Sequence, residues 1–251
     1  MRLRSAGIAV DVGIGAAQAR HDHAGHIRRM HDGRPHVMLK LAISADGKAG
    51  AAGRRPLAIT GERVHDRVHL LRAQSDAIMI GIGTALADDP TLTCRLPGMA
   101  GYSPVRVVLD SALRLPLSSR LVRTAREVPV WVVTGTQGSR VVQEALEAEG
   151  VEILRAPGEG GCLDLSAVLR LLAERGMTRL MVEGGPTLAA AFLAADLVDE
   201  AVLFQSPKVV GADGIDALDG LPLTALTQSP HLVSVRSEAV GADTYELFER
   251  R

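Results

Sequence analysis

The chain has 251 residues, two cysteines and a formal net charge of −1, and 47% of its residues are hydrophobic. This length allows one large domain or two small ones, and two cysteines are too few for a disulfide framework, which favours a reducing cytoplasm. The charge balance and the 2% aromatic content argue against nucleic-acid binding, which needs a basic face or stacking side chains. No apolar run is long enough to cross a bilayer, and the first residues lack the apolar centre of a secretory signal. We therefore expect a soluble, cytoplasmic protein with a small-molecule partner.

Residues 1–35 differ in character from the rest of the chain. Residues 5–12 predict a short strand, residues 16–30 a polar helix, and Gly33-Arg34-Pro35 a linker. This segment carries a group of histidines: His21, His23, His26 and His31. Their spacing fits no standard zinc pattern, so we interpret them as partly solvated side chains and predict no metal site.

From His36 onward, short apolar runs alternate with amphipathic segments. Strands are predicted over residues 37–44, 77–82, 105–109, 128–133, 151–154, 179–182 and 201–205, and helices over 62–72, 139–149, 165–174 and 188–195. Strands separated by such helices indicate parallel crossovers, and residues 232–235 and 244–248 predict a closing hairpin. The predicted fold class is α/β, a mostly parallel sheet flanked by helices with an antiparallel C-terminal hairpin.

The run from Leu180 to Leu188, LMVEGGPTL, is the most informative part of this pattern. An apolar strand stops at Glu183, two glycines follow, and Pro186 stands at a first helical position. Such a turn points free N–H groups and the positive end of a helix dipole beyond the strand, where a phosphate binds well. The alternative interpretation is an ordinary strand-to-helix turn.

Other polar residues follow the predicted strands at the same edge of the sheet, where α/β proteins bind ligands. They lie in residues 44–48, 81–84, 87–90, 91–95, 110–111 and 134–135. Gly81-Ile82-Gly83 is no dinucleotide fingerprint, because Leu86 replaces its third glycine. Asp88-Asp89 before a proline indicates a helix or turn boundary rather than a metal pair, and Cys94 reads as a buried, inert thiol. Arg72 with Arg95 can fork onto a phosphate, although a surface salt bridge is the default for a single arginine.

From about Arg34 to the C-terminus, the chain resembles the reductase half of the bacterial bifunctional riboflavin-biosynthesis deaminase/reductase. The resemblance implies a dihydrofolate-reductase-like fold. Several motifs carry it in the family's order: LKLAISADGK (39–48), LRAQSDAI (71–78), GIGTALADDP (81–90), LTCRLP (92–97), VVLD (107–110), VEGGPTL (182–188) and PKVVG (207–211).

The resemblance implies that NADPH reduces the ribosyl group of 5-amino-6-(5-phosphoribosylamino)uracil to a ribityl group. It assigns catalysis to Glu183, Lys40 and Asp46, and substrate binding to Arg72, Leu92, Arg95 and Glu183. It assigns the cofactor to Ile43, Ser44, Ala58, Thr84, Asp88, Gly185, Pro186, Thr187, Leu188, Ala189, Ala190 and Ala191. Family members associate as dimers through a sheet edge, so we expect a homodimer.

Two departures from the family pattern stand out. The family's S-x-W-I-T is here Pro56-Leu57-Ala58-Ile59-Thr60, without the serine and the tryptophan. Arg54 and Arg55 are candidates for a compensating phosphate contact or for the 2′-phosphate grip that would select NADPH. Residues 1–35 resemble the deaminase tail and its linker, with the reductase domain over 36–251. The deaminase zinc signature, H-x-E followed by P-C-x-x-C, is absent from the sequence. We therefore expect no deaminase activity and consider a separate deaminase as a partner.

Two alternatives stay open. One is the related reductase that acts on the 2,5-diamino-pyrimidinone before deamination. The other is a catalytically inactive binding module. The missing tryptophan favours the inactive module, whereas a set of retained residues argues against it: Lys40, Asp46, Thr84, Asp88, Arg95, Glu183 and the Gly184-Gly185 loop.

Overall fold

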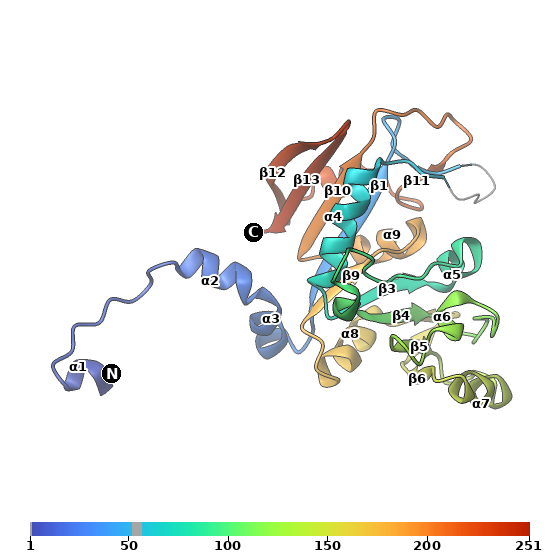
Figure 1. The fold of residues 1–251 in the computed structure, drawn as a ribbon, viewed down its shortest axis with the longest axis horizontal. Helices are drawn as coiled ribbons and strands as arrows, with labels where there is room; N and C mark the ends of the chain where they lie inside the picture. Colours follow the sequence, from blue (N-terminus) through green and yellow to red (C-terminus); the bar gives the residue numbers. More distant parts are fainter. Residues whose placement is uncertain (1, 52–56) are drawn as a thin grey trace.

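The computed structural model describes residues 2–51 and 57–251, and a nine-stranded sheet forms its centre (Figure 1). From β10 to β6 every neighbouring pair of strands is parallel, whereas β13 and β12 run antiparallel at one edge. The strands in spatial order are β12 (Leu232–Val240), β13 (Asp243–Arg250), β10 (Glu200–Gln205), β1 (His36–Ile43), β9 (Arg179–Val182), β3 (Ala77–Gly81), β4 (Val105–Leu109), β5 (Val130–Thr134) and β6 (Glu152–Arg155).

Helices cover both faces of this sheet. Buried side chains of α4 (Glu62–Ala73), α5 (Ile82–Asp88), α6 (Arg120–Arg123) and α7 (Arg140–Ala148) pack on one face. Those of α8 (Leu165–Glu174), α9 (Pro186–Ala194) and α10 (Thr224–Thr227) pack on the other. The central strands are buried on both faces, which explains why they read as continuous apolar runs.

The smaller elements lie at the edges of this body. Two short antiparallel ladders join β2 (Lys48–Gly50) to β11 (Ile215–Asp216) and β7 (Gly158–Glu159) to β8 (Cys162–Leu163), and a 3₁₀ turn spans Ala100–Tyr102. None of the helices in the described residues is long and apolar enough to cross a membrane.

The leader, residues 2–35, extends away from the sheet in Figure 1. It contains α1 (Arg2–Ser5), α2 (Ala16–Asp22) and α3 (Ala24–Asp32). Arg179 anchors the end of α2, because its Nη2 donates to the carbonyl oxygens of His21 and Asp22 at 2.8 and 3.1 Å. Among the described residues no group of three or more histidine, cysteine or acidic side chains is arranged to hold a metal ion.

The predicted fold class is confirmed, including the antiparallel hairpin, which is longer than expected. The strand predicted over residues 5–12 is wrong: α1 ends at Ser5, and the next residues form no ladder with any described strand. The helix predicted over residues 16–30 is broken at His23 into α2 and α3. Helix α5 was not predicted, because Gly81 and Gly83 read as turn residues.

Candidate active site

A cavity of about 1020 Å³ opens at the carboxyl ends of the central strands. Residues at or near the ends of β1, β3, β4 and β9 line it, together with α5, the start of α9 and the residues 215–220. This edge is where open α/β sheets bind ligands, and the volume lies at the upper end of the range for small-molecule sites. The size fits a dinucleotide together with a substrate.

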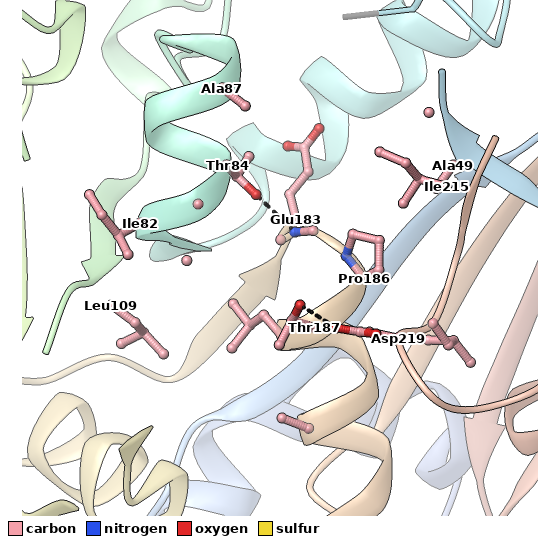
Figure 2. Close-up of a pocket in the computed structure, with 18 of the residues that line it drawn as sticks. Ala49, Ile82, Thr84, Ala87, Leu109, Glu183, Pro186, Thr187, Ile215 and Asp219 are labelled. Atoms are coloured by element: carbon pink, nitrogen blue, oxygen red, sulfur yellow. Dashed lines mark hydrogen bonds between the residues drawn. The ribbon is translucent and has the colours of Figure 1, made fainter. Parts of the chain in front are cut away.

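Glu183 follows β9 and its side chain projects away from the α9 turn in Figure 2. Arg72, from the last turn of α4, donates from Nε and Nη2 to both carboxylate oxygens, with distances of 2.9 to 3.0 Å. Lys40 Nζ on β1 donates to Glu183 Oε1 at 3.3 Å. Burial alone raises the pKa of Glu183, but the charges and hydrogen bonds of Lys40 and Arg72 outweigh it and hold that pKa below its usual value. Glu183 is therefore an ionised carboxylate.

The glycine turn after Glu183 has the predicted geometry. Helix α9 starts at Pro186 in its first position, and Gly185 N–H donates to Thr84 Oγ1 at 3.0 Å (Figure 2). Among the hydrogen bonds of the described chain, none uses the N–H of Gly184 or of Thr187 as donor. Free N–H groups at a helix start are suited to an anion such as a pyrophosphate. The donor set therefore fits a dinucleotide phosphate.

Two acidic side chains lie in the cavity wall near α5 and α9. Asp219 Oδ2 accepts the Thr187 hydroxyl at 2.9 Å, and Asp88 lines the cavity at the end of α5. Partial burial raises the pKa of Asp88 above its usual value. Asp89 caps α5 with a φ of 39°, which confirms the predicted helix boundary at this pair.

Asp46 lies outside the residues that line the cavity. Its carboxylate accepts hydrogen bonds from the Ser44 hydroxyl at 2.6 Å and from Val210 N and Gly211 N at 3.0 and 2.8 Å. The Ser44 hydroxyl, followed by the two backbone donors, lowers the pKa of Asp46 far below its usual value. A carboxylate so well satisfied is a poor proton donor, so the geometry favours a role in joining the two loops that carry β2 and β11.

The loop of residues 91–95 is fixed by side chains from the body of the fold. Arg72 Nη1 donates to Thr93 O at 3.2 Å, and Arg106, buried in β4, donates from Nη1 to Thr91 O at the same distance. Arg95 N–H donates to His69 Nδ1 at 3.3 Å, so this nitrogen of His69 is an acceptor. Burial, followed by the charges of Arg72 and Arg95, lowers the pKa of His69 and favours its neutral form.

Arg95 is exposed, and its Nη1 donates to Thr91 Oγ1 at 2.6 Å. The guanidinium of Arg72 donates to Glu183 and to Thr93 O, and a joint fork of Arg72 and Arg95 onto a phosphate stays a prediction. Arg95 is therefore the exposed member of the predicted phosphate pair.

The structure brings ten of the predicted site residues to the cavity wall: Lys40, Ala58, Thr84, Asp88, Glu183, Gly185, Pro186, Thr187, Leu188 and Ala191. Five other predicted site residues are buried in the protein interior: Ile43, Ser44, Leu92, Ala189 and Ala190. The side chains of Ala189 and Ala190, three and four residues after Pro186, pack in the core, and their contact with the cofactor stays a prediction. Arg54 and Arg55 lie outside the described residues.

Several residues near the site had no role in the sequence-based prediction: His69, Arg106, Arg114 and Asp219. Arg106 could have been identified from the sequence, because a charged residue inside the apolar run that forms β4 is unusual. No sequence pattern marks residues 215–220 as part of the site, since their position beside α9 depends on the pairing of β11 with β2.

Comparisons with known proteins identify the chain's relatives. A model of the RibD C-terminal domain matches residues 35–245. The riboflavin biosynthesis protein RibD of Escherichia coli (strain K12) is 35% identical over 255 residues, which cover 96% of this chain and 67% of that protein. The 2,5-diamino-6-ribosylamino-4(3H)-pyrimidinone 5′-phosphate reductase of Methanothermobacter thermautotrophicus is 38% identical over 213 residues, covering 84% of this chain and 95% of that reductase.

A solved structure agrees in fold. The diaminohydroxyphosphoribosylaminopyrimidine deaminase/5-amino-6-(5-phosphoribosylamino)uracil reductase of Thermotoga maritima superposes with a TM-score of 0.80 at 28% identity, covering 100% of this chain and 66% of that one. The chain thus spans about two thirds of the length of the RibD relatives it matches. The resemblance found in the motifs is confirmed, and the chain belongs to the RibD C-terminal domain family.

Proposed function

We propose that this chain reduces the ribosyl group of 5-amino-6-(5-phosphoribosylamino)uracil to the ribityl group with NADPH. A reductase of riboflavin biosynthesis follows from the family; the substrate and the cofactor are the proposal. The observation that carries it is the ionised Glu183, held between Lys40 and Arg72, at the wall of a cavity that also contains a turn with N–H groups suited to a phosphate. The Thermotoga maritima relative is named for this uracil substrate.

The cofactor supplies a hydride when it is bound. The chain's own contribution is to hold the dinucleotide: the N–H groups of Gly184 and Thr187 and the start of α9 suit its pyrophosphate. The Thr84 hydroxyl fixes Gly185 and thereby the shape of the turn. The apolar side chains of Ala49 and Ile215, opposite Pro186 in Figure 2, offer a dry wall for a ring.

Reduction at the sugar C1′ requires the ribose ring to open, and ring opening requires a proton on the ring oxygen. Glu183 is ionised and cannot supply that proton. Lys40 Nζ, 3.3 Å from Glu183 Oε1, is the ammonium group at the cavity wall next to that carboxylate. We assign proton donation to Lys40 and orientation of the open aminosugar to Glu183, whose oxygens can accept sugar hydroxyl or amine protons.

The substrate phosphate is assigned to Arg95. Its guanidinium is exposed and has only the Thr91 hydroxyl as a described partner, whereas Arg72 is committed to Glu183. A guanidinium on a loop that His69 and Arg106 hold in place is well suited to positioning a dianion.

A second substrate is favoured by one specific observation. The Methanothermobacter thermautotrophicus reductase, at 38% identity and with 95% of its length covered, is named for the 2,5-diamino-pyrimidinone phosphate. The two substrates differ in an oxygen or an amine on the pyrimidine ring, and both place the same ribosyl phosphate beside Lys40, Glu183 and Arg95.

The test is to mix the purified chain with NADPH and either substrate and to follow the nicotinamide absorbance. We expect oxidation with the uracil substrate to be the more efficient of the two. Greater efficiency with the diamino-pyrimidinone would transfer the proposal to that substrate. No oxidation with either would leave the inactive binding module as the better description.

The remaining assignments concern organisation. We also propose a reductase domain over residues 36–251, a remnant of a deaminase tail with its linker over 1–35, and a cytoplasmic homodimer joined through the free edge of β12. Light scattering after size exclusion tests the dimer, and a pull-down against a separate deaminase tests whether residues 1–35 bind one.

A further inference from the structure

A second cavity, of about 510 Å³, lies at the opposite edge of the sheet. Its wall includes the first residues of three parallel strands: His36 of β1, Arg179 of β9 and Glu200 of β10. Helix α4, which lies across this part of the sheet in Figure 1, contributes to the wall, and His21 at the end of α2 borders it. Among the described residues, none lines both this cavity and the one proposed for reduction. We call the second one the amino-end cavity.

A buried carboxylate at this wall lacks a hydrogen-bond donor. Glu200 is 7% exposed, and its side chain takes part in no hydrogen bond or close ion pair with any described residue. It lies on the α4 side of the sheet, because Val202, two residues further along β10, packs in the core beneath α4. Burial raises the pKa of Glu200, and the charges of His21 and Arg179 oppose this only in part. A ligand that supplies N–H donors to these oxygens therefore removes an existing cost of burial.

Apolar side chains form much of the remaining wall. They come from α4 and from the strands beneath it: Met38, Leu71, Tyr245 and Leu247. A cavity of this volume, with apolar walls and few polar groups, suits a small molecule with a flat ring. The ring would then lie between these side chains with its polar edge toward Glu200.

Positive charge gathers at another part of the wall. Arg67 of α4 lies over the ring of Tyr245, with its guanidinium carbon 5.1 Å from the ring centroid, and Arg236 comes from β12. Both donate to Glu238, at 3.3 and 2.6 Å, but Glu238 does not line the cavity. Arg236 is 54% exposed, and its Nη1 has no partner in the described chain. Two neighbouring guanidinium groups are suited to a phosphate.

We propose that the amino-end cavity binds a guanine nucleoside monophosphate, with the base on Glu200 and the phosphate on Arg67 and Arg236. Among the common bases, guanine alone presents two neighbouring N–H donors, the ring N1–H and the 2-amino group, which match the two oxygens of one carboxylate. Adenine and cytosine present an acceptor beside their amino group, and an acceptor would face the carboxylate unfavourably. The site is independent of the proposed reduction, because the two cavities lie at opposite ends of the strands.

Calorimetry on the whole chain with three probes tests this site without catalysis. The probes are GMP, IMP, which lacks the 2-amino group, and guanosine, which lacks the phosphate. The wild-type chain is expected to bind GMP about tenfold more tightly than either of the others, because each of them loses one charge-assisted contact. Equal affinity for GMP and IMP, or no binding of GMP, would overturn the proposal.

Two substitutions separate the base contact from the phosphate contact. Glu200→Gln keeps the shape of the side chain, and it is expected to weaken GMP about tenfold and to remove the preference for GMP over IMP. Arg236→Ala is expected to weaken GMP about tenfold and to leave guanosine unchanged. Wild-type affinity for GMP in Glu200→Gln, or an equal loss of GMP and guanosine in Arg236→Ala, would contradict the proposal.

Glu246→Gln is the matched control. Glu246 lies on β13 and accepts the Ser234 hydroxyl at 2.6 Å, but it does not line the amino-end cavity, so all three affinities are expected to stay at the wild-type values. Excess NADPH and the variant Gly185→Ala, which alters the other cavity, are likewise expected to leave the GMP affinity unchanged. Displacement of GMP by NADPH would place GMP in that other cavity and overturn the proposal. If the probes behave as expected and no substrate is reduced, the proposed function fails while this site stands.

Discussion

Arg72 and Glu183, 111 residues apart in the chain, form a bidentate ion pair in which Nε and Nη2 of the arginine donate to both carboxylate oxygens. The pair connects the last turn of α4 to the end of β9 and is largely buried, with side chains 12% and 15% exposed. Because α4 also carries His69, which accepts the N–H of Arg95, one helix positions both the carboxylate and the loop proposed for the substrate phosphate.

Replacing Glu183 by glutamine tests the centre of this arrangement. The change keeps the shape and removes the charge that holds Lys40 and Arg72, so turnover is expected to fall about 100-fold or more, with the fold retained by circular dichroism. Glu238→Gln is the control, since Glu238 also accepts from two arginines, Arg67 and Arg236, away from the cavity. Wild-type turnover in Glu183→Gln would remove this carboxylate from the active site.

Replacing Arg95 by alanine tests the phosphate assignment. The KM for the substrate is expected to rise about tenfold or more, because one charge-assisted contact to the phosphate is lost, while the KM for NADPH stays within about twofold. Arg140→Ala, at a side chain that is 89% exposed and pairs with Glu144 within α7, is expected to change neither constant. A rise confined to the NADPH constant would mean that Arg95 holds a cofactor phosphate instead.

Replacing Gly185 by alanine tests the cofactor turn. A Cβ at this position would stand 3.0 Å from Thr84 Oγ1, the atom that accepts the Gly185 N–H, so the Thr84 side chain must move by a few tenths of an ångström and its hydrogen bond to the turn is disturbed. The NADPH dissociation constant is expected to rise about tenfold, with thermal stability reduced only slightly. Gly101→Ala is the control, because a Cβ there meets nothing within 4 Å. Unchanged NADPH affinity in Gly185→Ala would argue against a pyrophosphate on this turn.

His36 makes stability depend on pH. Burial, opposed by the charge of Asp199, lowers the pKa of His36 to about 4, whereas the unfolded chain has the ordinary value of about 6.5. Between these values the unfolded chain takes up a proton that the folded chain does not, so the free energy of unfolding decreases as the pH falls through this window. The loss from this group is at most about 3 kcal/mol by pH 4, and urea unfolding at a series of pH values measures it.

His36→Gln has no proton to bind, so its unfolding free energy is expected to decrease less over the same window. His31→Gln is the control, because His31 is exposed in the leader. An equal pH dependence in wild type and His36→Gln would assign the acid sensitivity to other groups.

The strands and the larger helices could be predicted because their residues carry the pattern themselves. Four residues of β5 and three of β9 are apolar and buried on both faces, and Val64, Val68 and Leu71 mark the inner face of α4. The segment after Ser5 shows the limit of such patterns. Its alternating apolar residues suit a strand, but a strand needs a neighbour for its backbone hydrogen bonds, and no described strand pairs with it.

The sequence by itself determined that an acidic side chain stands next to a helix start with free N–H groups, because the carboxylate, the two glycines and the proline are neighbours in the chain. Only the tertiary structure decided that Lys40 and Arg72 donate to that carboxylate. It also decided that Asp46 accepts hydrogen bonds from the loop before β11 and that Arg114 lines the same cavity. These relations join residues far apart in the chain, from Lys40 to Glu183 and from Asp46 to Gly211. Their distances depend on the packing of parallel strands and on the helix that crosses them, which no local pattern encodes.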